Sequence, residues 1–488
     1  MKSSSFSSLR IVLSRMLNKE LITPRLLVTA AIAGCVTGLI CSLFEILPSM
    51  LDTMRVIWLN ALELPLWQKL LLAFGLSFVL GAIAIYLTKR FAPEAGGSGI
   101  PEIEGAMLGL RPVRWQRVLP VKFFGGLLSL SSGMVLGREG PSIQIGGNLG
   151  MMVALLLRLK TDDCKTLLAA GGAAGLASAF NAPLAGILFV LEELRLQFKF
   201  NYASVQGVCV TVLCAAIVRD LICGTAPVFE LPSFQMVDIS DLFLFFVFGI
   251  VMGGFGVFFN RAVNTCQNLY QKIYGGRLGR TVLIVGVVAG CFGILSLVFP
   301  MGAGSGMSLI PSWIISDKSS EFLLVVLIVR VLAIFLCFCS GIPGGIFAPS
   351  LSVGAVSGSL FGMLLVNAGY INFNPGIMAI VGMGTFFAAS VRAPVTGIIL
   401  VCEMTSNFNF LLPMLVSVST ASYVAGILKG SPIYTQILER TLRLGNDEKA
   451  LVDFDLIVDP TNQQVLPMQG VSAQIFHQAG SEMMKACQ

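Results

Sequence analysis

The sequence is poor in charged residues. Asp, Glu, Lys and Arg make up 12% of its 488 residues, whereas a soluble globular chain has about 25%. Apolar residues make up 55%, and the mean hydropathy is +0.85. So few charges cannot cover a surface that faces water on all sides. This excludes a soluble enzyme, a disordered protein and a nucleic-acid-binding protein.

The sequence also lacks the residues of the common metal and nucleotide sites. It has one histidine, His477, and its 12 cysteines include no Cys-x-x-Cys pair. A zinc site needs clustered Cys and His ligands. Gly-x-Gly-x-x-Gly and Walker motifs are missing as well, which argues against a bound nucleotide. We therefore expect no metal and no cofactor, and we interpret the cysteines as small buried apolar residues.

Long apolar runs take up most of the chain. A helix needs about 20 apolar residues to cross a membrane. Clear runs of this kind are 26–50, 70–88, 118–136, 167–191, 203–222, 241–260, 281–299, 322–340, 376–402 and 410–428. Shorter or glycine-rich runs lie near 98–110, 141–157 and 346–366. The sequence therefore predicts an all-α polytopic membrane protein.

Proline interrupts two of these runs. Pro183 lies within the run 167–191, and Pro394 lies within the run 376–402. A proline inside a membrane helix frees a backbone carbonyl, which is tolerated only where protein or water can satisfy it. Broken helices are typical of transporters and channels.

Basic residues predict which loops face the cytoplasm. Lys and Arg gather in residues 1–25 and in the loop 261–280, whereas the loop 223–240 has neither. We therefore expect the loop 223–240 outside the cell. We expect the N-terminal segment 1–25 and the polar tail 445–488 in the cytoplasm.

The chain contains an internal repeat. One set of residues returns 211 positions later: Gly171, Pro183, Gly186 and Glu192 recur as Gly382, Pro394, Gly397 and Glu403. So many matches at one spacing indicate two homologous halves, 26–230 and 231–444.

The charges at the ends of two equivalent runs show how the halves are related. The run 70–88 leads into Lys89-Arg90, whereas its counterpart 281–299 follows Arg277 and Arg280. The second half is therefore inverted relative to the first. In inverted repeats with broken helices, the substrate site lies where the repeats meet.

Three short motifs rich in glycine and proline precede helical runs. They are Gly97-Ser98-Gly99-Ile100-Pro101, Gly137-Arg138-Glu139-Gly140-Pro141 and Gly345-Ile346-Phe347-Ala348-Pro349. Glycine lets backbone N–H groups approach a ligand, and proline in a first helical turn removes no needed donor. Helix N-termini carry partial positive charge and unpaired N–H groups, so the motifs predict an anion site. The alternative is that these glycines serve only close helix packing.

Glu139 is a carboxylate within an apolar region. A charge at membrane depth costs roughly 2.5–3.5 kcal/mol on insertion scales and is usually functional. The repeat counterpart of Glu139 is Phe347, so symmetry does not require a carboxylate there. Such a group could compete with a mobile anion at a helix N-terminus and also carry a proton. The alternative is a structural ion pair with Arg138.

Glu192 and Glu193 follow the apolar run 184–191. Glu192 recurs as Glu403, which favours a structural or capping role. Glu193 has Met404 as its counterpart, and an unmatched carboxylate suits proton uptake from one side. The alternative for Glu193 is a solvated charge at a helix end.

Four other polar residues are candidates for a functional or a structural role. Ser98 and Tyr434 can donate hydroxyl hydrogen bonds without a full charge, which suits a weakly held, mobile anion. For Tyr434 the alternative is an aromatic residue at the membrane interface. Glu102 and Glu104 lie in a first helical turn, where acidic residues favour the helix dipole, so we interpret them as structural.

The three motifs and Tyr434 resemble those of the CLC family of chloride channels and proton/chloride antiporters. The resemblance covers roughly residues 26–444 and is closest to the bacterial proton/chloride exchange transporters. It implies an inverted-repeat CLC-type fold with tilted and broken helices. It also implies a homodimer in the lipid bilayer with one anion pathway per subunit.

The resemblance also implies roles for individual residues. The implied ligands of a central chloride are the hydroxyls of Ser98 and Tyr434 and the backbone N–H groups of Ile346 and Phe347. Glu139 is similar to the external gating glutamate, and Glu193 to the internal proton-transfer glutamate of the exchangers. Serine at position 98, rather than proline, resembles the members that prefer chloride.

These observations favour a proton-coupled chloride antiporter of a bacterial inner membrane. A role in acid resistance, as an electrical shunt, is suggested by the resemblance alone. A passive voltage- or pH-gated chloride channel is the first alternative, and Glu193 argues against it. An intramembrane hydrolase using Glu139 and Glu193 as acid and base is a distant alternative, because the sequence lacks a nucleophile–base pair and a metal motif.

Overall fold

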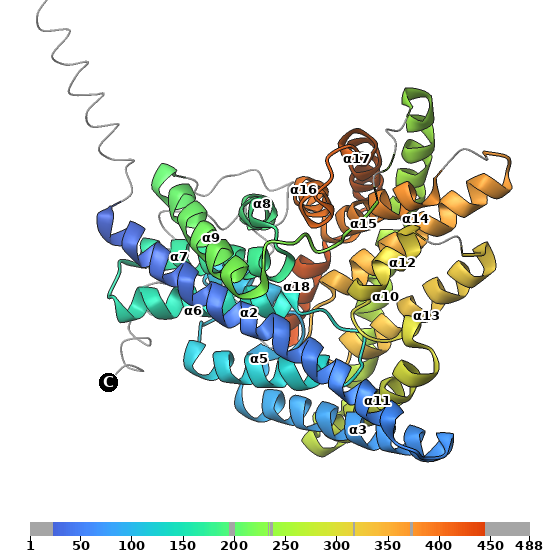
Figure 1. The fold of residues 1–488 in the computed structure, drawn as a ribbon. Helices are drawn as coiled ribbons and strands as arrows, with labels where there is room; N and C mark the ends of the chain where they lie inside the picture. The colour runs from blue at the N-terminus through green and yellow to red at the C-terminus, as the bar shows by residue number, and fades with distance from the viewer. Residues whose placement is uncertain are drawn as a thin grey trace, which may run out of the picture.

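The computed structural model describes residues 23–194, 201–232, 234, 238–315, 318–370 and 374–444. The tail 445–488 and most of the segment 1–25 lie outside these residues, and so do the expectations made for them. The described chain consists of helices and their connections, with one isolated antiparallel bridge (Figure 1). The predicted all-α architecture is confirmed.

The second part of the chain repeats the helix order of the first. The helices of the first part are α2 (Pro24–Ala61), α3 (Leu66–Phe91), α4 (Ile100–Leu108), α5 (Trp115–Leu130), α6 (Glu139–Leu156), α7 (Thr161–Phe180), α8 (Pro183–Glu193) and α9 (Tyr202–Cys223). Those of the second are α10 (Leu242–Tyr274), α11 (Leu278–Val298), α12 (Ile310–Ile315), α13 (Ser320–Phe338), α14 (Phe347–Asn367), α15 (Pro375–Val391), α16 (Pro394–Thr405) and α17 (Leu411–Ile427). A last helix, α18 (Ile433–Leu444), follows them.

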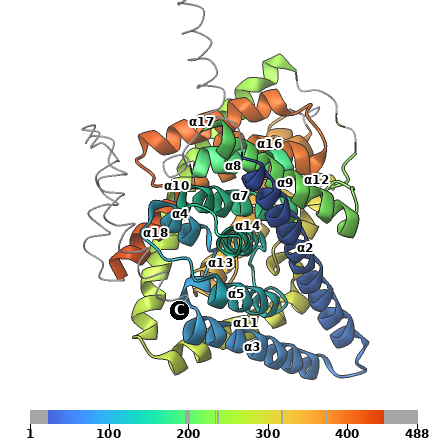
Figure 2. The ribbon, with the colours of Figure 1, turned by 90° about the vertical axis from the view of Figure 1, so that its left-hand side faces the viewer.

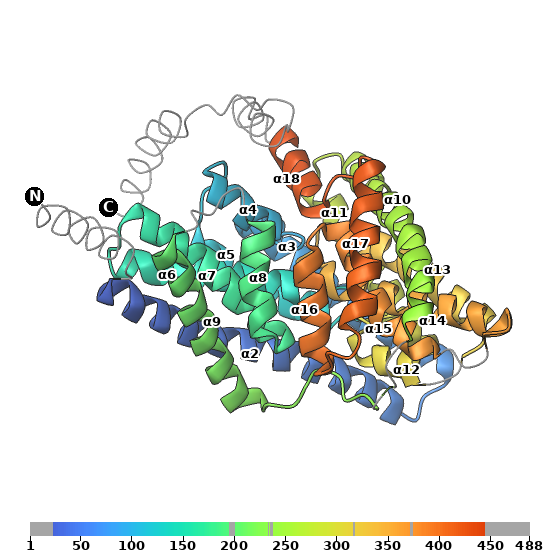
Figure 3. The ribbon, with the colours of Figure 1, turned by 90° about the horizontal axis from the view of Figure 1, so that it is seen from above.

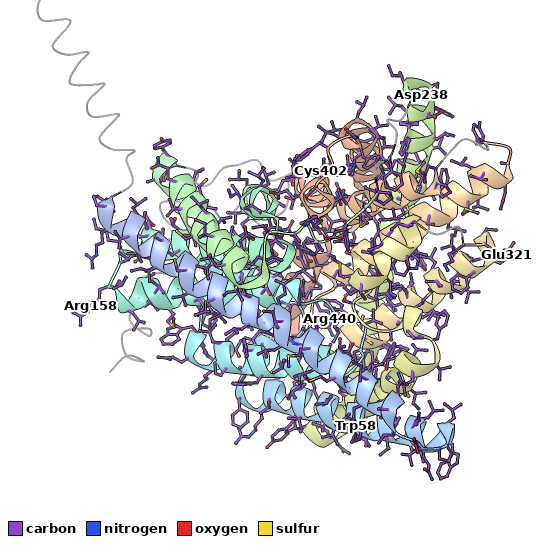
Figure 4. The ribbon with its side chains drawn as sticks, in the orientation of Figure 1. Trp58, Arg158, Asp238, Glu321, Cys402 and Arg440 are labelled. Atoms are coloured by element: carbon purple, nitrogen blue, oxygen red, sulfur yellow. The ribbon has the colours of Figure 1, made fainter. Side chains whose placement is uncertain are left out.

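Seven of the described helices are long and apolar enough to cross a membrane. They are α2, α3, α9, α10 with the turn before it, α11, α13 and α14. Large apolar side chains such as Trp58, Leu71 and Phe243 are more than half exposed on this molecule. Trp58 lies at the periphery, as do Asp238 and Glu321 (Figure 4). So much exposed apolar surface suits contact with lipid rather than with water.

The glycine-rich runs near 141–157 and 346–366 form the buried helices α6 and α14. Figure 2 shows α14 near the middle of the molecule. Gly146 of α6 faces Gly171 of α7 so closely that a Cβ on either would lie 2.1 Å from the other's carbonyl oxygen. Gly354 of α14 and Gly382 of α15 repeat this contact, with the same distance at 2.3 Å. Small residues thus let two central helix pairs pack backbone to backbone, as is common in membrane proteins.

Both proline interruptions are real helix breaks. α7 is closed by Asn181, the residue after its last turn, with φ of +50°, and α8 begins at Pro183. In the same way α15 is closed by Arg392, with φ of +72°, and α16 begins at Pro394. Each of the predicted runs 167–191 and 376–402 is therefore two helices. α8 packs back against α7, and α16 against α15.

Some boundaries differ from the apolar runs. α2 continues to Ala61, well past the predicted end at residue 50, and contains Pro48. α5 ends at Leu130 rather than at 136, because the chain must then turn to deliver the motif that begins at Gly137. Hydropathy alone predicts neither the extension of α2 nor the early end of α5.

A candidate anion site where the two repeats meet

The motifs around Gly137 and Gly345 are hydrogen-bonded to each other. The Gly137 N–H donates to the Gly345 carbonyl at 2.7 Å, and the Gly345 N–H donates to the Gly137 carbonyl at 2.6 Å. α6 begins two residues after Gly137, and α14 begins two residues after Gly345. The N-termini of two equivalent helices therefore meet, and their positive ends lie close together.

Glu139 lies at this meeting point. It is the first residue of α6, and its side chain is buried. Its Oε2 accepts a hydrogen bond from the Ala348 N–H of α14 at 3.3 Å. A Cβ on Gly137 would lie 2.2 Å from the same oxygen, so glycine at 137 leaves room for the carboxylate. The chain thus supplies a carboxyl group to the N-terminus of α14.

Arg138 forms an ion pair elsewhere. Its guanidinium lies 2.8 Å from a carboxylate oxygen of Glu45 on α2 and also donates to the Ala179 carbonyl at 3.3 Å. The ion pair of Arg138 in this structure is therefore with Glu45. It is not with Glu139, the partner named as the alternative in the sequence analysis.

The first motif is joined to the same centre. Gly99 has φ of +87° and precedes α4. The Gly97 N–H donates to Ile342, and the Gly97 carbonyl accepts from Gly344, at 3.2 and 3.0 Å. The first motif is thus hydrogen-bonded to the residues just before the third motif, which in turn is bonded to the second.

Ser98 and Tyr434 each bring a buried hydroxyl group that has no hydrogen-bond partner among the described residues. Ser98 packs on the start of α6, because a Cβ on Gly140 would lie 2.2 Å from its Oγ. Tyr434 lies in the first turn of α18, within electrostatic range of Glu139 and Glu193. Buried hydroxyls normally have partners. Two donors left over beside helix N-termini suit an anion.

Phe347 takes the place in α14 that Glu139 has in α6. Its ring packs against Phe180 of α7 and Phe387 of α15, with ring centroids 5.0 and 4.3 Å apart. One of the two equivalent positions therefore holds a carboxylate and the other an aromatic cluster. This makes the site asymmetric although the backbone is repeated.

Two buried cations that the sequence analysis did not single out hold the loops of the site. The Lys122 ammonium group donates to the carbonyls of Ala95 and Gly97 at 3.0 and 2.7 Å. Arg330, at the equivalent place in α13, donates to the carbonyls of Met301 and Gly304 at 2.9 and 3.2 Å. Both side chains are fully buried. Lys122 and Arg330 are separated in the sequence by the same number of residues as Gly137 and Gly345, and this spacing could have identified them as an equivalent pair.

Glu192 and Glu403 cap each other's helices. Glu192, near the end of α8, accepts from the N–H groups of Val395 and Thr396 at 2.9 and 2.7 Å. Glu403, near the end of α16, accepts from those of Leu184 and Ala185 at 3.0 and 2.8 Å. Figure 3 shows α8 and α16 side by side. The capping role predicted for this pair is confirmed.

The remaining carboxylates occupy distinct places. Glu193 is the last residue of α8 and is half-buried. Glu102 forms a two-pronged ion pair with Arg111 at 2.9 and 3.1 Å, as a structural residue would. Glu104 is buried and accepts a long hydrogen bond of 3.4 Å from Thr435. Thr435 is the neighbour of Tyr434, so Glu104 connects α4 to α18.

Comparisons with known proteins agree with this geometry. Residues 80–426 match the family model described as voltage gated chloride channel. The chain is 45% identical to the H(+)/Cl(-) exchange transporter ClcA of Citrobacter koseri over 444 residues, which is 90% of this chain and 93% of that protein. It is 45% identical to the protein of the same name from Vibrio cholerae over 437 residues, which is 88% of this chain and 93% of that protein.

Solved structures give the same picture. The structure of a slow cyanobacterial Cl-/H+ antiporter is 36% identical in sequence and superposes with a TM-score of 0.82. The match covers 87% of this chain and 100% of that one. A eukaryotic CLC transporter is 25% identical with a TM-score of 0.73, covering 85% of this chain and 73% of its own.

Proposed function

Because this chain belongs to the voltage gated chloride channel family, known as CLC, we propose that it is a proton-coupled chloride antiporter of a bacterial inner membrane. Relatives named as exchange transporters match nine-tenths of the chain. The observation that carries the proposal is the hydrogen bond from Ala348 to the buried Glu139 carboxylate. It supports a titratable group that competes with the transported anion.

Chloride binds between the helix N-termini in this proposal. The ligands are the backbone N–H groups of Ile346 and Phe347 and the hydroxyls of Ser98 and Tyr434. The N-terminus of α14 offers about half a positive charge. Neutral donors hold the anion without the tight grip of a full opposite charge, so it can also leave.

Glu139 acts as the external gate. As a carboxylate it occupies the α14 N-terminus and excludes chloride. When it takes up a proton it loses its charge, its hold on the Ala348 N–H weakens, and an anion can take its place. Release of the proton returns the carboxylate to the site. One group therefore links the passage of chloride to the movement of a proton.

Glu193 accepts protons from the cytoplasmic side in this proposal. Its carboxyl group, at the end of α8, interacts electrostatically with Tyr434, which supports a proton route that leads toward the proposed chloride site. The proton route through Glu193 then departs from the anion route. This distinguishes an exchanger from the second candidate, a passive chloride channel on the same scaffold.

We further propose a homodimer with one pathway per subunit, built from halves 26–230 and 231–444, with both termini in the cytoplasm. Contact with the bilayer and membership of a transporter family support a non-enzymatic role, and an acid-resistance role rests on the resemblance alone.

The reversal potential of the purified protein in liposomes tests the function. With crossed chloride and pH gradients, a chloride gradient should drive protons uphill. A potential that follows chloride alone would identify a channel. Absence of any anion flux would reject both candidates.

A further inference from the structure

Asn260 of α10 joins three parts of the chain with one side-chain amide. Its Nδ2 donates to the carbonyl oxygens of Ser390, at the end of α15, and Ser431, just before α18, at 2.8 and 3.1 Å. Its Oδ1 accepts from the Ser390 hydroxyl at 2.6 Å. Asn260 is buried, so these partners fix the amide on both sides.

The turn held by Asn260 is packed tightly on α10. Gly430 lies so close to Val257, about one turn before Asn260, that a Cβ would come within 2.6 Å of it. Arg392 donates to the Gly430 carbonyl and Arg261 to the Leu428 carbonyl, each at 3.3 Å. The start of α18 therefore has a defined position relative to α10 and α15.

The far end of α18 is held by the same helix. Arg440, labelled in Figure 4, donates to the Gln267 carbonyl, to Asn268 Oδ1 and to Gln271 Oε1 at 2.9 to 3.0 Å. Of the two attachments, the one at Asn260 lies closer in sequence to Tyr434, since Ser431 precedes Tyr434 by three residues. The position of Ser431 sets where the first turn of α18 begins, and so where the Tyr434 hydroxyl lies.

We propose that Asn260 is a positioning residue for the anion site, which it serves by fixing the first turn of α18 and hence the Tyr434 hydroxyl. This inference rests on the proposed function, in which Tyr434 donates to chloride. Small displacements of a positioned group have large effects on what it binds. Without the amide, Ser431 loses its side-chain donor, and the Tyr434 hydroxyl moves away from its position.

A double-mutant cycle between Asn260 and Tyr434 tests the proposal. Chloride affinity by calorimetry and the ratio of chloride to proton flux are measured for Asn260→Ala, Tyr434→Phe and the double variant. We expect Asn260→Ala to raise the chloride Kd by about 2- to 13-fold, the value of one hydrogen bond. We expect the double variant to be no weaker than Tyr434→Phe alone, because both changes remove the same contact.

Asn268→Ala is the matched control. It removes an asparagine of α10 that holds the other end of α18, and Arg440 keeps two of its three partners. Its chloride affinity should stay within about twofold of wild type. An Asn268→Ala effect as large as that of Asn260→Ala would mean that any loosening of α18 suffices, and would overturn the proposal.

Further outcomes separate this inference from the proposed function. Wild-type affinity in Asn260→Ala, or an effect fully additive with Tyr434→Phe, overturns the inference while leaving the antiporter intact. Absence of chloride binding in the wild type overturns the proposed function itself. If Asn260→Ala is not monodisperse on gel filtration, Ser390→Ala replaces it in the cycle. That milder change removes only the hydroxyl that orients the amide, and we expect a smaller shift that again vanishes in the Tyr434→Phe background.

Discussion

Glu139 and Ala348 are 209 residues apart in the chain, yet the Ala348 N–H donates to the Glu139 carboxylate at 3.3 Å. Glu139 is the first residue of α6 and Ala348 the second residue of α14, and these two helices hold equivalent places in the chain. The relation runs one way only, since the counterpart of Glu139 is Phe347, whose ring lies among other aromatic side chains. A repeated backbone thus carries a carboxyl group at one position and an aromatic ring at the equivalent one.

Replacing Glu139 by Gln should leave anion passage and abolish proton coupling. Glutamine has nearly the same shape but no charge, so it mimics the protonated, displaced state of the carboxyl group. Chloride efflux and proton uptake are measured in parallel in liposomes. Glu102→Gln, which changes a carboxylate paired with Arg111, is the control and should stay coupled. Uphill proton movement driven by chloride in Glu139→Gln would contradict the gating role.

Ser98→Ala combined with Tyr434→Ala should weaken chloride binding without abolishing it. Each lost hydroxyl removes about 0.5–1.5 kcal/mol, so the Kd should rise by about 5- to 160-fold in total. The backbone donors of Ile346 and Phe347 remain. Titration calorimetry gives the affinity. Ser178→Ala is the control, because that hydroxyl bonds within its own helix. An unchanged affinity in the double variant would remove both hydroxyls from the site.

Gly137→Ala should displace the Glu139 side chain without removing its carboxyl group. The new Cβ would lie 2.2 Å from Glu139 Oε2, and the end of a flexible side chain can move away more easily than the backbone. We therefore expect folded protein in which Glu139 no longer reaches Ala348 and coupling is partly lost. Gly75→Ala, where no atom lies within 4 Å, is the control. A fully coupled Gly137→Ala protein would show that the carboxylate does not need this space.

The sequence allowed the site to be predicted where its residues act through the local backbone. Pro183 and Pro394 begin new helices because proline lacks an N–H and suits a first helical turn, whereas Pro48 lies within α2 without ending it. The glycine-rich motifs also indicated helix N-termini through local backbone chemistry, since each ends in a proline that suits a first helical turn. The spacing of the repeat also paired Glu192 with Glu403, although it did not show that each caps the other's helix.

Other features depend on contacts between distant segments and could not be predicted. A lone lysine in an apolar run does not reveal which carbonyls it will meet, so Lys122 was missed despite its spacing from Arg330. Arg138 was considered as a partner of its neighbour, but Glu45 on another helix is its partner. The length of α2 was underestimated because its second part is less apolar than the first, while contacts such as the Arg55–Asp52 pair extend it.

The last prediction concerns Glu193 and its neighbour Glu192. Glu192 holds the N-terminus of α16 through Val395 and Thr396, whereas Glu193 has no carboxylate counterpart in the repeat and lies within electrostatic range of Tyr434. A proton needs titratable or water-lined steps, whereas chloride needs N–H and O–H donors, so the two routes need not coincide. Glu193→Gln should therefore carry chloride without protons and keep its chloride affinity.

Glu192→Gln is the matched control for this experiment, one position away on the same helix. It weakens the cap on the N-terminus of α16, so it should lower the free energy of unfolding by about 0.5–2 kcal/mol. It should affect proton coupling less than Glu193→Gln does. Parallel proton and chloride fluxes, together with thermal unfolding in detergent, distinguish the two roles. Unimpaired proton exchange in Glu193→Gln would make this residue a solvated helix end. The main argument against a passive chloride channel would then be lost, because that argument depends on Glu193 as an internal proton acceptor.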